Sequence, residues 1–458
     1  MPQGRKRSSG ALRVCPWRQR TLSVYDATIA CRTEKKRDQR MPDSSSVPPE
    51  TVAVRPAPTP QQLALKRQYP TAFDLRERAR RRLPNFAFEY ADGGAGADNG
   101  IKRNWNALDA VEMVPRYGRV VSPPSADTTI FGKPYAAPIG IAPIGGPGTA
   151  FPGAETYLAN AAQAVKVPYA LGLLSGIDIE RAAEIAPDVL WLQLYRFSKN
   201  DHKIGLDLVR RAQEAGVNVL VLTVDTPTRT TRPREVKSGI MNPFKLTMRL
   251  RLDAMRSPHW MRSLGRNGIP RFTSLAPYME PGIDLAKASA FIRRESGGAF
   301  TWDEIKLYRD KWDGPLVLKG VMHPDDAERA VESGLDGIFV TNHGGRQIDA
   351  LPAPIDVLPE IAARVGGKCT VLYDSGLRSG VDAARAVALG AEAAFAGKSF
   401  LWSLGALGDR GPAHLIDVYI DDICATMGQL GCRNIEELRG VITRHPGAYT
   451  VADFTSAQ

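Results

Sequence analysis

The sequence has few cysteines, no long apolar run and no dinucleotide-binding fingerprint. Five of its 458 residues are cysteines and none form a CxxC pair, so neither a zinc site nor a disulfide framework is indicated, and a reducing compartment fits this usage. No apolar run reaches the roughly 18 residues of a bilayer-spanning helix. The stretch Gly93-Gly94-Ala95-Gly96 follows a predicted helix instead of a strand, so it is not a Rossmann fingerprint.

The formal charge of +11 is concentrated at the N-terminus. Residues 1–40 hold eleven Lys or Arg and three Asp or Glu, and they contribute +8 of the total. The remaining chain lacks the mixture of basic and aromatic residues that is typical of a nucleic-acid groove. We therefore expect no nucleic-acid partner.

Residues 1–65 are predicted to form a disordered tail, because they are rich in Arg, Ser and Pro and lack apolar periodicity. Two explanations of residues 1–40 stay open. They are an Arg-rich, acid-poor transit peptide, or they precede a true start at Met41. Residues 66–458 are predicted to form the folded part, with order beginning near Phe73.

Beyond Pro138, short apolar segments alternate with helical ones, the pattern of a parallel barrel. Strands are expected at 139–142, 168–172, 189–194, 219–224, 315–319, 337–341, 370–374 and 392–396. Helices are expected between them, for example at 155–165, 179–185, 206–215, 324–333 and 380–389. Before the barrel, helical spacing runs from Leu75 to Tyr90 and ends at Gly93. Eight strand–helix units predict an α/β fold of the TIM (β/α)8 barrel type.

The alternation is interrupted by an insert at about 238–300, after the fourth strand, which is too long for an ordinary loop. Residues 241–271 hold seven Lys or Arg and one acidic residue. Phe244, Met248, Leu252 and Met255 have helical spacing within it. A basic amphipathic segment can lie in an anionic membrane surface. The alternative is a lid or subunit contact at the barrel mouth, and both interpretations stay open.

The stretch Val340–Asp349, Val-Thr-Asn-His-Gly-Gly-Arg-Gln-Ile-Asp, carries the strongest chemical signal. It follows the apolar strand Gly337–Val340, and barrels of this type present catalytic groups where their strands end. His343 offers a base that works near neutral pH. Arg346 offers a planar fork for a carboxylate.

Two glycine loops follow the seventh and eighth strands. They are Asp374-Ser375-Gly376-Leu377-Arg378-Ser379-Gly380 and Ala396-Gly397-Lys398. Phosphate sites in these barrels are built from the same two loops, through backbone N–H groups and a helix N-terminus. The loops therefore predict a phosphate site, with Arg378 and Lys398 supplying charge.

Together these motifs closely resemble the FMN-dependent 2-hydroxy-acid oxidases and dehydrogenases, over residues 73–440. That family includes glycolate oxidase, lactate oxidase and quinone- or cytochrome-linked lactate and mandelate dehydrogenases. The resemblance implies FMN as cofactor and oxidation of an (S)-2-hydroxy acid, with L-lactate the leading candidate, to the 2-oxo acid. It also implies that His343 takes the hydroxyl proton while the α-hydrogen leaves as hydride. A carbanion route, in which His343 removes the α-proton, stays open.

The resemblance further implies roles for residues on other strands. Asp225 would orient His343, and Lys319 would stabilise the reduced flavin ring. Arg346 and Arg232 would bind the substrate carboxylate, although counting back from Glu235 would favour Arg234 over Arg232. Tyr90 and Tyr195 would contact the substrate. The residues implied at the cofactor are Pro143, Ile144, Gly145, Gly172, Gln193, Thr223, Lys319, Asp374, Gly376, Arg378, Gly397 and Lys398.

Three positions depart from the family. Gly172 stands where a Ser or Thr usually contacts the flavin ring, so one hydrogen bond to the ring is in doubt. Lys398 replaces an arginine in the phosphate loop, which keeps the charge and loses the fork. Gly145-Gly146 stands where a small or hydroxylic residue is common, which leaves more room over the flavin.

The acceptor of the electrons is a quinone, a cytochrome or oxygen, and oxygen would yield hydrogen peroxide. The insert favours a dehydrogenase, cytoplasmic or peripheral on the inner face of a membrane, and the resemblance implies a homotetramer. Two other hypotheses are a different FMN-barrel chemistry and a flavin-binding scaffold without turnover. The paired arginines argue against the first. The presence of His343, Lys319 and Arg346 argues against the second.

Overall fold

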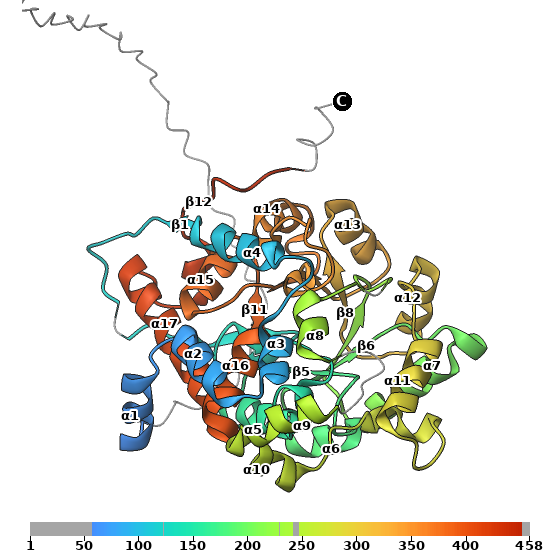
Figure 1. Cartoon of the computed structure of the whole chain (residues 1–458). Coiled ribbons are helices and arrows are strands. Elements are labelled where there is room, and N and C mark those ends of the chain that lie inside the picture. Colours follow the sequence, from blue (N-terminus) through green and yellow to red (C-terminus); the bar gives the residue numbers. More distant parts are fainter. Residues whose placement is uncertain (1–56, 122, 229, 241–246, 451–458) are drawn as a thin grey trace, which may run out of the picture. The chain divides into compact units, whose positions relative to one another are not determined.

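The computed structural model describes residues 57–450, apart from 122, 229 and 241–246. A closed barrel of eight parallel strands forms its centre, in the order β10-β11-β4-β5-β6-β7-β8-β9 (Figure 1). The strands are β4 Ile139–Ile141, β5 Tyr169–Gly172, β6 Leu190–Leu194, β7 Val219–Thr223, β8 Leu316–Val321, β9 Gly337–Val340, β10 Thr370–Asp374 and β11 Ala393–Ala396. Each predicted strand is therefore confirmed, and so is the barrel.

Aromatic side chains fill the inside of the barrel. The ring centroids of Phe339 and Phe395 lie 4.8 Å apart, and those of Trp191 and Phe395 lie 5.2 Å apart. These rings are buried, and Phe395 also forms part of the floor of a cavity above them. The barrel is thus packed through its middle and open to a ligand at the C-terminal ends of its strands.

Helices surround the barrel because each strand returns to the next through one of them. They are α5 Ala154–Val165, α6 Ile179–Ile185, α7 Lys199–Glu214, α12 Trp302–Arg309, α13 Pro324–Glu332, α14 Pro354–Val365, α15 Gly380–Ala388 and α16 Lys398–Leu407. The chain then continues through α17 Gly411–Leu430 and α18 Ile435–Arg439. Strands buried on both faces explain the near-continuous apolar runs of the sequence.

The N-terminal segment forms helices α1 Pro60–Gln68, α2 Ala72–Arg82, α3 Asn85–Asp92 and α4 Asn99–Asp109. The predicted tail boundary at residue 65 is therefore wrong, because Thr59 and Gln62 make a capping box that starts α1. The remainder of the predicted tail, 1–56, lies outside the described residues. The single helical pattern from Leu75 to Tyr90 is two helices, because Pro84 disfavours helical geometry at the preceding residue.

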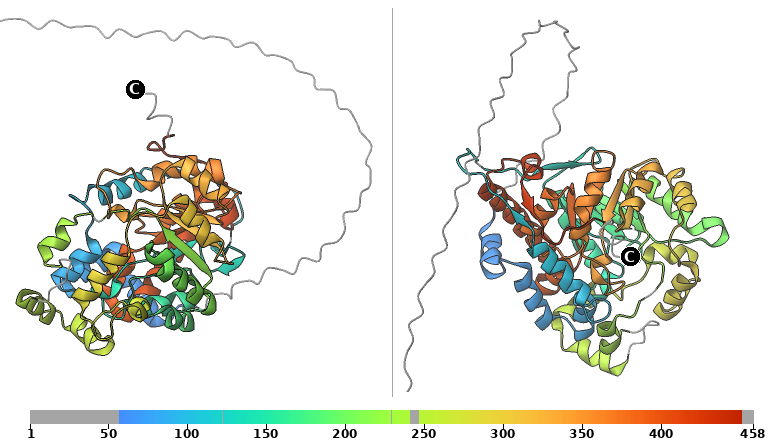
Figure 2. Two further views of the ribbon diagram at one scale, coloured as in Figure 1. Left: turned by 90° about the vertical axis from the view of Figure 1, so that its right-hand side faces the viewer. Right: turned by 90° about the horizontal axis from the view of Figure 1, so that it is seen from above.

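Helix α8 Pro233–Ser238 ends where the insert begins. The insert contains α9 Met248–Met255, α10 Pro258–Asn267, the 3-10 turn η2 Thr273–Tyr278 and α11 Leu285–Glu295. The indole of Trp260 donates to Ala150 O at 3.2 Å, and Thr273 N donates to Ser175 O at 3.0 Å. These contacts hold the insert on the loops after β4 and β5. Helix α10 lies at the lower edge of the molecule in Figure 1, with α9 next to it, and Figure 2 gives two further views of the fold. Phe244, part of the predicted helical pattern, lies outside the described residues.

Two short strand pairs were not expected from the sequence. They are β1 Glu112–Met113 with β12 Thr443–Arg444, and β2 Thr128–Ile130 with β3 Lys133–Tyr135. Strands of two or three residues are too short to show an alternating pattern. Within the part of the chain that the structure describes, no helix is both long and apolar enough to cross a bilayer.

Candidate active site

A cavity of about 1050 Å³ opens at the C-terminal ends of the barrel strands, beneath the insert. The predicted residues that line it are Tyr90, Pro143, Ile144, Gly145, Tyr195, Arg232, Lys319, His343, Arg346, Asp374, Gly376, Gly397 and Lys398. Side chains that lie far apart in the sequence thus meet in one place. Gly172, Gln193, Thr223, Asp225 and Arg378 are not among the lining residues of the described chain.

His343 and Asp225 form the predicted pair. His343 Nδ1 lies 2.9 Å from Asp225 Oδ1, across the loops that follow β9 and β7. Burial raises the pKa of Asp225, but the charges of His343 and Lys319 and the hydrogen bond to His343 outweigh it, so the pKa falls below its ordinary value. An ionised Asp225 can accept a hydrogen bond from Nδ1 of His343, which leaves Nε2 free to act as a base.

The His343 loop has a strained backbone that its neighbours hold in place. His343 adopts a φ of 59°, in the left-handed region that few residues other than glycine occupy. Ser375 Oγ accepts a hydrogen bond from Gly344 N at 2.9 Å and lies 3.0 Å from Thr341 Oγ1. Asn342 exchanges two amide hydrogen bonds with Asn104 of α4, at 2.9 and 2.7 Å. These contacts fix the direction of the imidazole. Ser375 was not among the site residues predicted from the sequence, although its place in the loop after the seventh strand was a signal for it.

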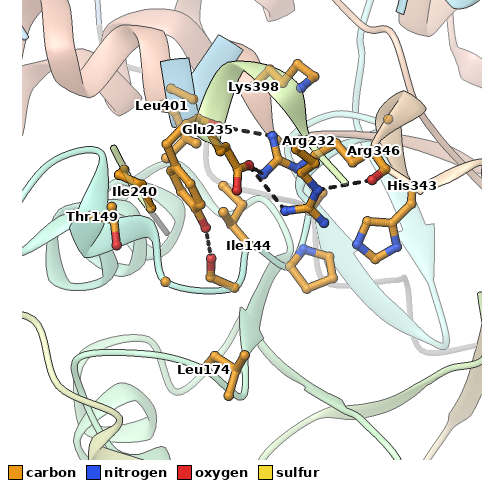
Figure 3. Close-up of a pocket in the computed structure, with 18 of the residues that line it drawn as sticks. Ile144, Thr149, Leu174, Arg232, Glu235, Ile240, His343, Arg346, Lys398 and Leu401 are labelled. Atoms are coloured by element: carbon orange, nitrogen blue, oxygen red, sulfur yellow. Dashed lines mark hydrogen bonds and ion pairs between the residues drawn. The ribbon is translucent and has the colours of Figure 1, made fainter. Parts of the chain in front are cut away.

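Arg346 is held by backbone carbonyls and by one carboxylate. Its Nη1 donates to Tyr90 O at 3.0 Å and to Gly93 O at 2.8 Å, and its Nη2 donates to Glu235 Oε1 at 2.6 Å. Burial and nearby Arg232 lower the pKa of Arg346, and Glu235 opposes that change. Figure 3 shows Glu235, Arg232 and Arg346 turned toward one another beside His343. Glu235 was not among the site residues predicted from the sequence; its signal was an acidic residue close to the two candidate arginines.

Arg232 and Arg234 occupy different environments. Arg232 lines the cavity, and its Nε donates to Arg346 O at 3.1 Å. Arg234 pairs with Glu89, with Asp92 at 2.9 Å and with Asp98 at 3.0 Å. Its donors therefore serve a structural network that joins α8 to the helices before the barrel. The geometry favours Arg232 over Arg234 as a substrate-binding residue.

Lys319 lies in the C-terminal half of β8 and lines the cavity. Its Nζ is 2.9 Å from Asp374 Oδ2. Burial lowers the pKa of Lys319. The negative charges of Asp374 and Asp225 raise it by more than burial lowers it, so the pKa lies above its ordinary value. The group stays positively charged and faces the cavity, where it can stabilise negative charge that develops on a ligand.

Buried polar side-chain atoms at the ends of β6 and β7 have no protein partner among the described residues. They are Gln193 Nε2 at the end of β6 and Thr223 Oγ1 at the end of β7. Buried polar groups are normally hydrogen-bonded, so such atoms indicate a place for a ligand with polar edges. A flavin ring has such edges, and these two residues fit it.

The glycine loops form the other end of the cavity, where Gly376, Gly397 and Lys398 line it. Lys398 Nζ donates to Gly93 O at 2.5 Å, and burial together with Arg346 holds the pKa of Lys398 well below its ordinary value. An incoming phosphate would favour the charged lysine.

Two predicted cofactor residues lie elsewhere. Arg378 forms ion pairs with Asp109 at 2.8 Å and with Asp382 at 3.3 Å, so its contact with the phosphate stays a prediction. A Cβ on Gly172 would lie 2.5 Å from Ile144 O. The close backbone of Ile144 therefore excludes the Ser or Thr that is usual there, and Gly172 offers no side-chain hydrogen bond to a ring.

Tyr90 closes one side of the cavity. Its hydroxyl donates to Gly145 O, and its ring lies 5.2 Å from the guanidinium carbon of Arg346. Burial raises the pKa of Tyr90 to about 12. The phenol therefore stays protonated and can donate a hydrogen bond at neutral pH. Tyr195 lines the cavity from the end of β6.

The chain is similar to known proteins over most of its length. The sequence profile of FMN-dependent dehydrogenases matches residues 79–444. An L-lactate dehydrogenase of Chromohalobacter salexigens is 35% identical over 80% of this chain and 93% of that protein. One of Caulobacter vibrioides is 36% identical over 81% of this chain and 96% of that protein.

The chain is similar to solved structures as well. The crystal structure of the monotopic membrane protein (S)-mandelate dehydrogenase superposes with a TM-score of 0.77 at 30% identity, covering 82% of this chain and 99% of that one. A mandelate oxidase superposes with a TM-score of 0.70 at 33% identity, over the same shares of the two chains.

Proposed function

Because the chain belongs to the FMN-dependent dehydrogenase family, we propose that it oxidises an (S)-2-hydroxy acid to the 2-oxo acid with His343 as its base. The family membership makes it an FMN-dependent oxidoreductase of 2-hydroxy acids that acts on the CH–OH group. The observation that carries the proposed residue roles is the contact of His343 with Asp225 in a cavity that also holds two arginines. A base beside a carboxylate-binding pair is what this reaction requires.

The protein's own groups fit FMN. When bound, FMN supplies the ring that accepts the two electrons of the substrate. Gln193, Thr223 and Lys319 would hold the ring, with Pro143, Ile144 and Gly145 against it. Gly376, Gly397 and Lys398 would hold the phosphate. The unpartnered atoms of Gln193 and Thr223 support this assignment.

His343 would accept the proton in either route that the sequence leaves open, from the hydroxyl or from the α-carbon. Asp225 would stabilise the imidazolium that results and hold its ring in place. Arg346 and Arg232 would bind the carboxylate, and Tyr90 and Tyr195 would hydrogen-bond the substrate. Lys319 would offset negative charge as the electrons arrive.

A matched pair of substitutions tests the choice between the two arginines. Arg232→Leu is expected to raise KM about 10- to 100-fold, because one charge-assisted hydrogen bond to the substrate carboxylate contributes about 1.5–3 kcal/mol. Arg234→Leu is expected to lower the melting temperature and to change KM little, because Arg234 pairs with Glu89, Asp92 and Asp98. Steady-state kinetics and thermal melting measure both. The reverse pattern would assign the substrate to Arg234.

L-Lactate is the proposed substrate, supported by relatives that are L-lactate dehydrogenases. A mandelate-type acid is the second candidate, because Gly145 and Gly146 leave the wall of the large cavity without side chains beside Leu174. Turnover with a dye as acceptor would compare both enantiomers of each acid. Formation of a 2-oxo acid from the (S) forms alone is expected. Activity on neither acid, or equally on (R) forms, would contradict the proposal.

We further propose that α9 and α10 attach the protein to the inner face of a membrane, where a quinone or cytochrome takes the electrons; oxygen is the alternative acceptor. Met248, Leu252 and Met255 are 67%, 47% and 58% exposed. Exposed arginines surround them at Arg249, Arg251, Arg256, Arg262, Arg266 and Arg271. Exposed apolar and basic side chains together suit an anionic lipid surface.

A homotetramer is proposed from the family resemblance, and light scattering tests it.

Membrane attachment predicts the behaviour of a charge-introducing variant. Leu252→Glu with Met255→Glu is expected to weaken binding to phosphatidylglycerol vesicles more than tenfold, because each apolar side chain contributes about 1.5–3 kcal/mol when buried. Ile442→Glu, at a residue 69% exposed outside the insert, is the matched control and should bind as the parent does. Vesicle sedimentation measures all three. No binding by the parent protein, or equal binding by the double variant, would refute the attachment.

A further inference from the structure

Glu235 faces both arginines that are proposed to bind the substrate carboxylate. It lies in the first turn of α8, and its side chain is 15% exposed. One of its oxygens, Oε1, accepts from Arg346 Nη2 at 2.6 Å and lies 3.3 Å from Arg232 Nη1 (Figure 3). The same carboxylate oxygen therefore links the two guanidinium groups.

This link fixes how the two forks are presented to a ligand. The Nη1 protons of Arg346 go to backbone carbonyls, and one Nη2 proton goes to Glu235. A guanidinium has five N–H donors in one plane, so the contacts leave the other Nη2 proton and the Nε proton to point in set directions. Arg232 is tied to Arg346 by its own Nε, through the carbonyl oxygen of Arg346. Because Glu235 also binds both side chains, a rotation of either guanidinium group would break a contact with the other arginine or with Glu235.

Glu235 also sets the charge of the pair. Two guanidinium groups in a common site repel each other, and Arg232 lowers the pKa of buried Arg346 for that reason. With Glu235 ionised, the three side chains carry one net positive charge. A single substrate carboxylate balances that charge at the arginine pair, whereas a second carboxylate beside the same pair would meet no further net positive charge there and would lose hydration.

We propose that Glu235 is a positioning and specificity-determining residue that holds Arg232 and Arg346 as a pair and makes the site selective for 2-hydroxy monocarboxylates over 2-hydroxy dicarboxylates. The inference rests on the proposed function, in which these arginines bind the substrate carboxylate. Glu235 acts through the arginines and does not itself take part in the oxidation.

The test measures the binding of two carboxylates that do not react, propanoate and succinate, through the change they cause in the absorbance of the bound flavin. The holoenzyme should bind propanoate more tightly than succinate. In Glu235→Gln, which keeps the shape and removes the charge, the ratio of the succinate Kd to the propanoate Kd should fall at least tenfold, since a unit charge at this distance acts strongly in a partly buried site. The kcat on a monocarboxylate substrate should stay within a few-fold while its KM changes.

Two controls make the result decisive. Glu89→Gln removes the same charge from a neighbouring residue that pairs with Arg234, and it should leave the Kd ratio unchanged. Glu235→Asp keeps the charge, so it should preserve the Kd ratio even if its shorter side chain weakens the binding of both ligands. If Glu235→Gln unfolds at a low temperature, Glu235→Asp becomes the informative variant. An unchanged ratio in folded Glu235→Gln, or a lost ratio in Glu235→Asp, overturns the inference. A holoenzyme whose flavin spectrum responds to neither ligand contradicts the proposed function instead.

Discussion

Replacing His343 by glutamine is expected to lower kcat by about 10²–10⁴-fold, the contribution usual for a positioned general base. Glutamine has similar length and polarity but cannot take a proton near neutral pH. The change should therefore leave FMN bound and KM within a few-fold, because the carboxylate contacts proposed for Arg346 and Arg232 stay intact. Stopped-flow reduction of the flavin measures the effect directly.

The matched control is His323→Gln. His323 is an exposed residue that caps α13 through Asp325 N, and it lies outside the cavity lining. It should reduce its flavin as fast as the parent protein does. A His343→Gln protein that retains flavin and turns over within tenfold of the parent would remove His343 from the role of base.

Asp225→Asn is expected to lower kcat by about 10²–10³-fold with little change in KM. The asparagine fits the same space beside His343 Nδ1, 2.9 Å away in the parent protein. It lacks the negative charge that stabilises the imidazolium when His343 takes the proton, and loss of one such electrostatic contact has an effect of this size. Flavin reduction rates measured over a range of substrate concentrations separate kcat from KM.

Asp188→Asn provides the comparison for this charge change. Asp188 is 57% exposed and pairs with Lys166, away from the cavity. Its substitution should leave the rate unchanged. If Asp225→Asn reduced its flavin at the parent rate, the carboxylate would have only a structural role in the loop after β7.

The barrel was predictable because its signals are local, whereas the contact between His343 and Asp225, 118 positions apart, was implied by the family resemblance. Each strand is a short apolar run, and catalytic groups in this fold follow strand ends. Helix α1 carried a local signal too, the capping-box spacing of Thr59 and Gln62, which the bias of composition around it obscured. Composition is an average over many residues, whereas a helix N-cap depends on only two residues, here Thr59 and Gln62.

Arg378 and Glu235 could not be assigned from local signals. Arg378 sits in a glycine loop typical of a phosphate site, yet Asp109, 269 positions earlier, takes its guanidinium. Glu235 becomes informative only through Arg346, 111 positions away. Charged side chains choose partners by distance in the folded chain, so their roles depend on contacts that spacing alone does not reveal.

The central claim is that a 2-hydroxy acid delivers its electrons to FMN in this cavity. The most direct measurement is the absorbance of the purified yellow protein after anaerobic addition of (S)-lactate or (S)-mandelate, followed by air. We predict that one of these acids bleaches the flavin band, that the (R) enantiomer does not, and that colour returns slowly in air and quickly with a quinone. Rapid recovery in air would identify an oxidase. A protein without flavin, or a band that survives every 2-hydroxy acid offered, would contradict the account.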